Sequence, residues 1–268
     1  MRDRADPAFD GVAAGYDARF TNQPITRHLR AEVMETVFSL LPARGGKVLE
    51  VGCGTGADAR SLADRGHRVL ATDAAPEMLR LAEAKAGERQ DFECALWRIG
   101  DAVPPQVTEG APYDMVFSNF GALNCVEDLP GFGQDCAALV RPGGHVVLVL
   151  INRWCLMEVL LGALRRDRTS MTRRFRKIRD TRLEDGTRLR VHFPSTRDVA
   201  AAIGASFSLI RREPVGVFLP PSEYFESFQR RPRLLRAVFW LDRTLGHLWP
   251  LFRLGDHVLI VLRREDGS

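Results

Sequence analysis

The residues best suited to chemistry lie in one short glycine-rich segment, Gly52-Cys53-Gly54-Thr55-Gly56, which follows the apolar run from Lys47 to Val51. Glycine lets a backbone turn tightly and approach a ligand without a Cβ in the way. Asp73 follows the segment, and Asp101 comes later, directly after a glycine. The first carboxylate can accept hydrogen bonds from both ribose hydroxyls of an adenosine ligand, and the second from the adenine amino group. Together these residues predict a site for an adenosine-containing ligand.

The spacing of the glycines separates the classes of nucleotide site. A dinucleotide site prefers G-x-G-x-x-G, whereas this segment reads G-x-G-x-G and continues with Ala57. A phosphate-binding loop is excluded because no Gly-Lys-Ser/Thr follows. An NAD-binding oxidoreductase therefore remains only as an alternative.

The elements around this segment alternate between strands and helices. Helices are expected over 27–41, 57–64 and 77–85 and, in broken form, over 129–140; strands over 47–51, 67–72, 95–99, 113–118 and 145–151, with later candidates at 207–217 and 257–263. The fifth strand is almost entirely Val and Leu, so it is buried on both faces. This alternation predicts an α/β fold with a parallel sheet covered by helices, and the glycine segment lies at the ligand-binding edge of that sheet.

Composition excludes several classes of protein. The chain of 268 residues is 45% apolar and 27% charged, so it is not disordered. Its longest apolar stretch, 154–164, contains Glu158 and is too short to span a bilayer. The N-terminus has no apolar signal region, and a cytoplasmic location is expected. Five cysteines without C-x-x-C spacing predict neither a disulfide framework nor a metal site.

At this point the sequence resembles the class I S-adenosylmethionine-dependent methyltransferases, from about Phe9 to Ile151. The resemblance rests on an ordered set of motifs: Phe9-Asp10, Tyr16-Asp17, the glycine segment, Asp73, Gly100-Asp101, Tyr113-Asp114-Met115-Val116 and Leu139-Val140-Arg141-Pro142-Gly143-Gly144. It implies a Rossmann-like, doubly wound, mostly parallel seven-stranded sheet with helices on both faces. It also implies S-adenosylmethionine as methyl donor and S-adenosylhomocysteine as product.

The resemblance assigns cofactor contacts to residues at the strand ends and on the segment before the first strand. These are Tyr16, Glu50, Gly52, Cys53, Gly54, Gly56, Asp73, Ala74, Met78, Gly100, Asp101, Ala102, Asn119 and Phe120. The run 118–124 follows the fourth strand and is expected to line the methyl-transfer site. It lacks the Asn/Asp-Pro-Pro-aromatic motif of enzymes that methylate amino groups of nucleic acids, and the Pro-Cys pair of cytosine C5 enzymes is also missing. A nucleic-acid substrate is therefore not expected.

Two inserts without α/β rhythm, 152–190 and 218–256, are expected to form a helical lid over the substrate. From 153 to 190 there are twelve basic and five acidic residues. This cluster is interpreted either as a solvated helix face or as a pocket for an anionic acceptor. An RNA groove and a membrane or lipid surface remain further alternatives. The predicted acceptor contacts are Asn124, Arg173, Arg174, Arg176 and Tyr224.

A general base is needed only if the acceptor nucleophile is protonated, as a phenol or alcohol is. His192, Tyr224, Glu158 and Glu223 lie in or near the inserts and are the candidates, with His192 first because of its pKa and Tyr224 second.

The resulting prediction is a single methyltransferase domain with a helical segment over 1–44, a cofactor core over 45–151 and a cap over the inserts. Its acceptor is a small, partly apolar metabolite of natural-product type. The alternatives are a lipid, quinone or isoprenoid acceptor, and a regulatory module that binds the cofactor without catalysis.

Overall fold

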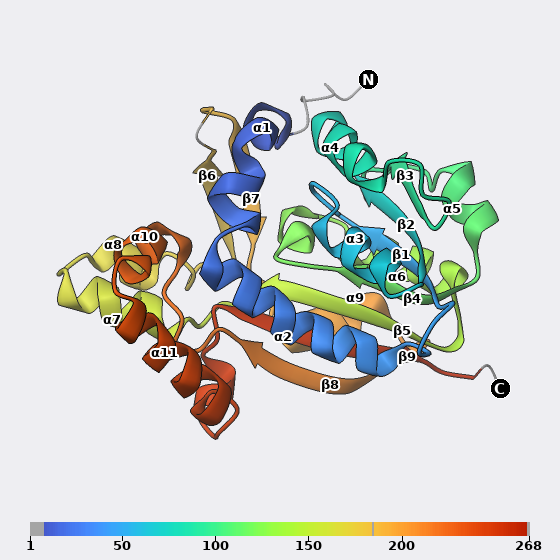
Figure 1. Cartoon of the computed structure of the whole chain (residues 1–268). Coiled ribbons are helices and arrows are strands. Elements are labelled where there is room, and N and C mark those ends of the chain that lie inside the picture. The colour runs from blue at the N-terminus through green and yellow to red at the C-terminus, as the bar shows by residue number, and fades with distance from the viewer. Residues whose placement is uncertain (1–7, 184, 267–268) are drawn as a thin grey trace.

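The central feature of the fold is a seven-stranded sheet in the order β3-β2-β1-β4-β5-β9-β8 (Figure 1). The computed structural model describes residues 8–183 and 185–266. The strands are β1 (Lys47–Val51), β2 (Arg68–Asp73), β3 (Phe92–Leu96), β4 (Tyr113–Ser118), β5 (Val140–Ile151), β8 (Phe207–Val215) and β9 (His257–Arg264). Strands β1 to β5 pair in parallel, whereas β9 is antiparallel to both β5 and β8. The predicted doubly wound, mostly parallel sheet of seven strands is therefore confirmed.

Helices cover both faces of this sheet because its strands are apolar on both sides. In β5, Val147 and Val149 belong to one core, while Val146 and Leu148 belong to the other. The first core is closed by α2 (Pro24–Leu40), α3 (Ala57–Asp64) and α4 (Pro76–Ala86), and the second by α5 (Pro105–Gly110), α6 (Leu129–Leu139) and α9 (Thr196–Ile203). The described part of the chain holds no helix long and apolar enough to span a membrane.

The segment before β1 is helical, as the apolar spacing predicts. It contains η1 (Asp10–Val12), α1 (Ala13–Tyr16), the π-helical turn η2 (Asp17–Thr21) and α2. Helix α2 begins at Pro24, three residues before the predicted start, because proline is favoured at the first helical position. Its buried residues Leu29, Val33 and Val37 lie on the face that packs against the sheet.

The first insert differs from the prediction of a purely helical lid. It contains α7 (Leu156–Leu164) and α8 (Arg168–Thr172), but then the strands β6 (Ile178–Arg182) and β7 (Arg188–His192). These two strands pair in an antiparallel hairpin that forms a separate sheet. Along β6 the side chains alternate between exposed and half-buried, and this period of two identifies a strand although three of its five residues are charged.

The second insert is helical and packs against the first. It contains η4 (Ser222–Tyr224), α10 (Phe225–Gln229), α11 (Pro232–Leu245) and η5 (Leu251–Arg253). The amide of Leu156 donates to the carbonyl of Leu254 at 2.9 Å, and the side chain of Asn152 donates to the carbonyls of Arg253 and Gly255. Figure 1 shows α7, α8, α10 and α11 gathered beyond the carboxyl end of β5.

One strand is shifted from its predicted position. The third strand was expected over 95–99 but runs from Phe92 to Leu96. Its Trp97 amide still donates to the carbonyl of Asp73, but the chain then leaves the sheet. Gly100 and Asp101 consequently lie in the connection to α5 and not at the end of β3.

Candidate active site

The glycine turn after β1 is held to the neighbouring strand by its own backbone. The amides of Gly52 and Cys53 both donate to the carbonyl of Thr72 in β2, at 2.8 and 2.9 Å. Gly52, Gly54 and Gly56 all have positive φ, at 71°, 54° and 75°. A Cβ on Gly52 would collide with Ala122, whereas a Cβ on Gly54 would meet no atom within 4 Å. The backbone at Gly54 therefore faces open space, as a turn that approaches a ligand requires.

Asp73 ends β2 beside this turn and organises it. Its Oδ2 accepts from the Gly54 amide at 2.8 Å and its Oδ1 accepts from the Ala75 amide at 2.9 Å. Burial raises the pKa of its carboxyl group, although these amides partly offset that effect. A carboxylate has about four acceptor positions, so each oxygen keeps one for a ligand hydroxyl.

Asp101 lies in a loop and not directly at the end of the third strand, where it was expected. It is exposed, as is Ala102, and it follows Gly100, whose φ is 95°. The loop position results from the early end of β3. A contact of Asp101 with adenine stays a prediction.

The N-terminal helical segment packs over the glycine turn. Tyr16 contacts the small apolar cluster that contains Met78 of α4. Asp17 accepts a hydrogen bond from Thr55 at 2.5 Å and forms an ion pair with Lys85 at 2.7 Å. Burial opposes the ionised form of Asp17, but its hydrogen bonds to Lys85 and Thr55 outweigh it and lower the pKa. Asp17 therefore ties the segment to the turn.

A cluster of buried charged and polar side chains lies beneath this segment. The sequence did not predict that these side chains contact one another. Arg30 of α2 forms an ion pair with Asp58 at 2.6 Å, and Asn119 donates to the other oxygen of Asp58 at 2.9 Å. Glu50 is 1% exposed, and burial, followed by the charge of Asp58, raises its pKa well above the ordinary value. Its Oε2 has no hydrogen-bond partner among the described residues. A cationic ligand group beside Glu50 would stabilise its charged form, so the site suits a cofactor that carries an ammonium group.

The loop after β4 brings an aromatic ring to the same region. Phe120 has a φ of 46°, and Gly121 follows with a φ of 84°. The guanidinium of Arg30 lies 5.2 Å from the centre of the Phe120 ring. The imidazole of His257 meets the ring edge-on, with the centroids 5.4 Å apart. Arg30 and His257 belong to this site, but their places in an apolar helix and at a strand end gave no motif to find them by.

Two of the predicted acceptor contacts serve the fold. Asn124 is fully buried, and its amide is used completely by the main chain of Ile151 and by the carbonyl of His192. Arg174 is 8% exposed and forms ion pairs with Glu158 at 2.5 Å and Asp256 at 2.7 Å. Each polar group therefore already has partners inside the protein, and a contact of either residue with an acceptor stays a prediction.

The other two arginines of this cluster differ from each other. Arg173 is half-buried and pairs with the first carboxylate oxygen of Glu158. Arg176 is exposed. Of the predicted cluster, Arg176 is therefore best placed to meet an anion from solvent.

The candidate bases are distributed over both inserts. His192 ends β7 next to η3 (Ala122–Cys125), and its Nε2 is buried without a hydrogen-bond partner among the described residues. Tyr224 is 9% exposed, with the guanidinium of Arg165 4.4 Å from its ring centre. Glu158 is neutralised by two arginines. The side chain of Glu223 lies outside the described residues.

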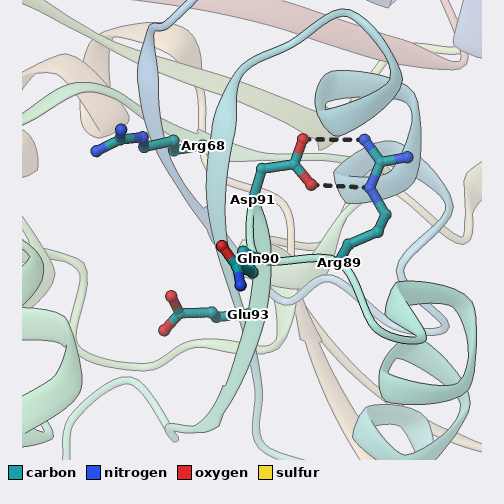
Figure 2. Close-up of a pocket in the computed structure, with 5 residues that line it drawn as sticks. All are labelled: Arg68, Arg89, Gln90, Asp91 and Glu93. Atoms are coloured by element: carbon teal, nitrogen blue, oxygen red, sulfur yellow. Dashed lines mark hydrogen bonds and ion pairs between the residues drawn. The ribbon is translucent and has the colours of Figure 1, made fainter.

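A depression elsewhere on the molecule does not coincide with these residues. Figure 2 shows it lined by Arg68, Arg89, Gln90, Asp91 and Glu93, at the amino ends of β2 and β3. Arg89 binds Asp91 through two hydrogen bonds of 2.8 and 3.0 Å, so these charges satisfy each other. The depression lies at the edge of the sheet opposite the glycine turn.

One group of side chains has ligand types suitable for a metal. His28, Glu32 and Asp242 bring one ligand atom each within 4.8 Å of the others. Asp242 also accepts a hydrogen bond from the Phe218 amide at 2.7 Å, which connects α11 to the loop after β8. The group therefore has a structural use without an ion.

The glycine turn lies within a segment that matches a known protein family. Residues 48–144 match the family model described as "Methyltransferase domain". The matched residues run from β1 to the start of β5 and include the turn, Asp73 and the loop after β4. This segment is therefore similar to a methyltransferase domain, in agreement with the resemblance of its motifs to the class I S-adenosylmethionine-dependent methyltransferases. The match agrees with the predicted cofactor, S-adenosylmethionine.

The curated relatives of this chain include proteins named for quinone biosynthesis. It is 33% identical over 133 residues to a ubiquinone biosynthesis O-methyltransferase of Methylocella silvestris, covering 48% of this chain and 49% of that protein. It is 32% identical over 143 residues to a demethylmenaquinone methyltransferase of Tropheryma whipplei, covering 52% and 56%. The chain thus spans about half the length of these relatives.

Solved structures extend the likeness of the fold to most of the chain. The N-methyltransferase NodS of Bradyrhizobium japonicum, in complex with S-adenosylhomocysteine, aligns with a TM-score of 0.57 at 12% identity, covering 97% of this chain and all of that one. A methyltransferase of Mesorhizobium loti aligns with a TM-score of 0.54 at 19% identity, covering 88% and 100%. At these identities the match concerns the fold alone.

Proposed function

We propose that this methyltransferase transfers a methyl group to the hydroxyl of a small aromatic acceptor of quinone type with an apolar tail. The observation that carries this proposal is the quinone naming of relatives that share the cofactor core. The second insert supports it, because it packs the apolar side chains of Phe225, Phe228 and Phe239 against the core beneath α2, where Phe120 from the loop after β4 also packs. These names favour the quinone alternative over the acceptor of natural-product type that the sequence suggested.

In this proposal the protein acts mainly by alignment and exclusion of water. S-adenosylmethionine, when bound, supplies an activated methyl group on a positively charged sulfur. Gly54 would present its backbone to the cofactor, Asp73 would accept hydrogen bonds from the ribose, and Glu50 would face the ammonium group. Tyr16 and Asp17 cover the turn from above. Arg30 and Phe120 line the side from which the acceptor approaches.

We further propose that the two inserts form the acceptor cap, because they bind each other and begin and end at the carboxyl edge of the sheet. Contact of the cap with a membrane surface and a cytoplasmic location stay predictions.

Two measurements test the proposal. Isothermal titration with S-adenosylhomocysteine and with NAD is expected to show binding of the first and none of the second. A methyl-transfer assay with a short-chain prenylated catechol is then expected to give a methyl ether, detected by mass spectrometry. Binding of the cofactor product without turnover of any catechol would favour the regulatory alternative.

A further inference from the structure

His257 occupies a position from which it can reach an acceptor. It begins β9 opposite Ile151, the last residue of β5, and so lies at the carboxyl edge of the parallel strands. Its side chain is 13% exposed and packs against Phe120 in the loop after β4. Alternate residues of β9, such as Leu259 and Val261, belong to the core beneath α2, so His257 points to the same face of the sheet as Arg30.

A buried carboxylate faces one nitrogen of this imidazole. Asp256 Oδ2 lies 3.0 Å from His257 Nδ1. The two atoms are within ion-pair distance, and Asp256 is the carboxylate that lies against this nitrogen. A carboxylate at this distance favours a proton on Nδ1, which leaves Nε2 as the acceptor of the neutral ring.

Asp256 is itself kept ionised by the first insert. Arg174 donates to its Oδ1 at 2.7 Å and to its main-chain carbonyl at 2.9 Å. Burial alone would raise the pKa of Asp256, but the charges of Arg174 and His257 outweigh it and hold that pKa well below its ordinary value. The thiol of Cys155 lies 3.7 Å from the same oxygen, and Glu158 is neutralised by Arg174.

The other histidine near the site lacks these features. The Nε2 of His192 is buried, and no carboxylate partner is found for it among the described residues. A base needs one nitrogen directed to the acceptor and the other held by a partner. His257 meets this requirement better than His192.

We propose that His257 is the general base that removes the proton from the acceptor hydroxyl, with Asp256 and Arg174 as positioning residues. The inference rests on the proposed transfer to a phenolic oxygen. In this step the acceptor oxygen forms a bond to the methyl carbon while the carbon–sulfur bond breaks and its electron pair stays on sulfur. The hydroxyl proton moves to Nε2 of His257 and then to solvent.

The first test measures single-turnover methyl transfer to the prenylated catechol as a function of pH. His257→Gln is expected to slow the step about 10²- to 10⁴-fold near neutral pH, as loss of a general base does. The difference in rate between the wild type and His257→Gln is expected to become smaller toward about pH 10, because a phenol ionises there without a base from the protein. His192→Gln and the exposed control His247→Gln should keep the wild-type profile. Affinity for S-adenosylhomocysteine should be unchanged in all three.

Asp256→Asn tests the positioning role while His257 stays in place. It is expected to lower the rate and to move the acidic limb of the pH profile to lower pH, because the negative charge that stabilises the protonated ring is removed. A merely structural role of Asp256 would lower stability without moving that limb.

The second test needs no turnover. 4-Nitrocatechol absorbs visible light when it ionises, so its titration on the S-adenosylhomocysteine complex reports proton transfer directly. We expect a lower apparent pKa of the probe on the wild type than on His257→Gln. If the probe ionises to the same extent on both proteins, or ionises on neither, the assignment of His257 is overturned. If ionisation of the probe depends on His257 but no catechol is methylated, the proposed acceptor is wrong, whereas the role of His257 as a base is retained.

Discussion

Asp73 is the residue on which the glycine turn and the predicted ribose contact both depend. Its two oxygens already hold the amides of Gly54 and Ala75. A further pair of hydrogen bonds from ribose hydroxyls to a charged acceptor would add about 1.5–3 kcal/mol. Asp73→Ala is therefore expected to weaken S-adenosylhomocysteine binding about tenfold to hundredfold, measured by isothermal titration.

The matched control for this variant is Asp64→Ala, which removes an exposed carboxylate from α3. Its affinity should equal that of the wild type. A folded Asp73→Ala protein with unchanged affinity would limit Asp73 to a role in the turn.

Asp242 gives a second prediction at the scale of one residue. Burial, assisted by the negative charge of Glu32, raises the pKa of its carboxyl group to about 6. Between the unfolded value of 3.8 and this folded value the native state binds more protons, so stability falls as pH rises through that window. Asp242→Asn removes this penalty and keeps an acceptor for the Phe218 amide. It should stabilise the protein above about pH 6 by about 1–3 kcal/mol and have little effect near about pH 4.

Urea unfolding at the two pH values measures this difference, with Asp266→Asn at an exposed site as the control. The same gain in stability at both values would show that the charge of Asp242 is not the cause.

At the scale of elements, the first insert is attached to the sheet by Arg174. Its replacement by Gln would leave the buried carboxylates of Glu158 and Asp256 without their main cation. Breaking a buried pair in this way costs about 3–5 kcal/mol. Arg176→Gln removes an exposed charge two residues away and should change stability by less than about 0.5 kcal/mol. Denaturant midpoints compare the two, and equal midpoints would contradict the anchoring role.

The close contact of α6 with α9 provides another prediction. A Cβ on Gly133 would lie 2.5 Å from the carbonyl oxygen of Ala202 and 2.7 Å from the Cα of Ile203. Both atoms are backbone, so the helices must separate. Gly133→Ala is expected to destabilise the protein by about 1–3 kcal/mol, whereas Gln134→Ala on the exposed face of α6 should have little effect. Thermal unfolding of the two variants is the measurement, and equal melting temperatures would refute the contact.

The elements that could be predicted are those whose burial leaves a pattern in the sequence. The apolar runs of β1, β4 and β5 are unambiguous because both faces of these strands are covered. The hairpin of β6 and β7 was missed because its arginines dominate the composition and its alternation involves Thr181, Leu189 and Val191 on the more buried face.

Within the site, the sequence predicted residues that belong to local motifs but not those assembled by tertiary contacts. The glycine turn and Asp73 lie close together along the first two strands. Arg30, Asp58 and His257 meet only when α2, α3 and β9 are packed, so no spacing along the chain could reveal them.

At the scale of the whole molecule, a single sheet connects β1, which precedes the glycine turn, to the distant strands β9 and β8. A ligand at a hundred times its dissociation constant stabilises the native state by about 2.7 kcal/mol. S-adenosylhomocysteine should therefore slow hydrogen exchange of the most protected amides by the same factor in β1 and in β9. The hairpin of β6 and β7 forms a sheet of its own, so the ligand should slow its hydrogen exchange by a smaller factor. Protection confined to β1 through β4 would show two independently unfolding halves instead.

The place of β9 between β5 and β8 also affects the synthesis of the protein. A ribosome makes the chain from its N-terminus at about 5–20 residues per second, so early segments wait for later ones. All parallel strands and β8 emerge before residues 257–264, and until then β8 has no strand beside it and β5 exposes an apolar edge. An exposed apolar edge invites pairing with other chains. A stalled or truncated product that ends before β9 would therefore be a substrate for chaperones, although it contains every residue of the matched methyltransferase domain.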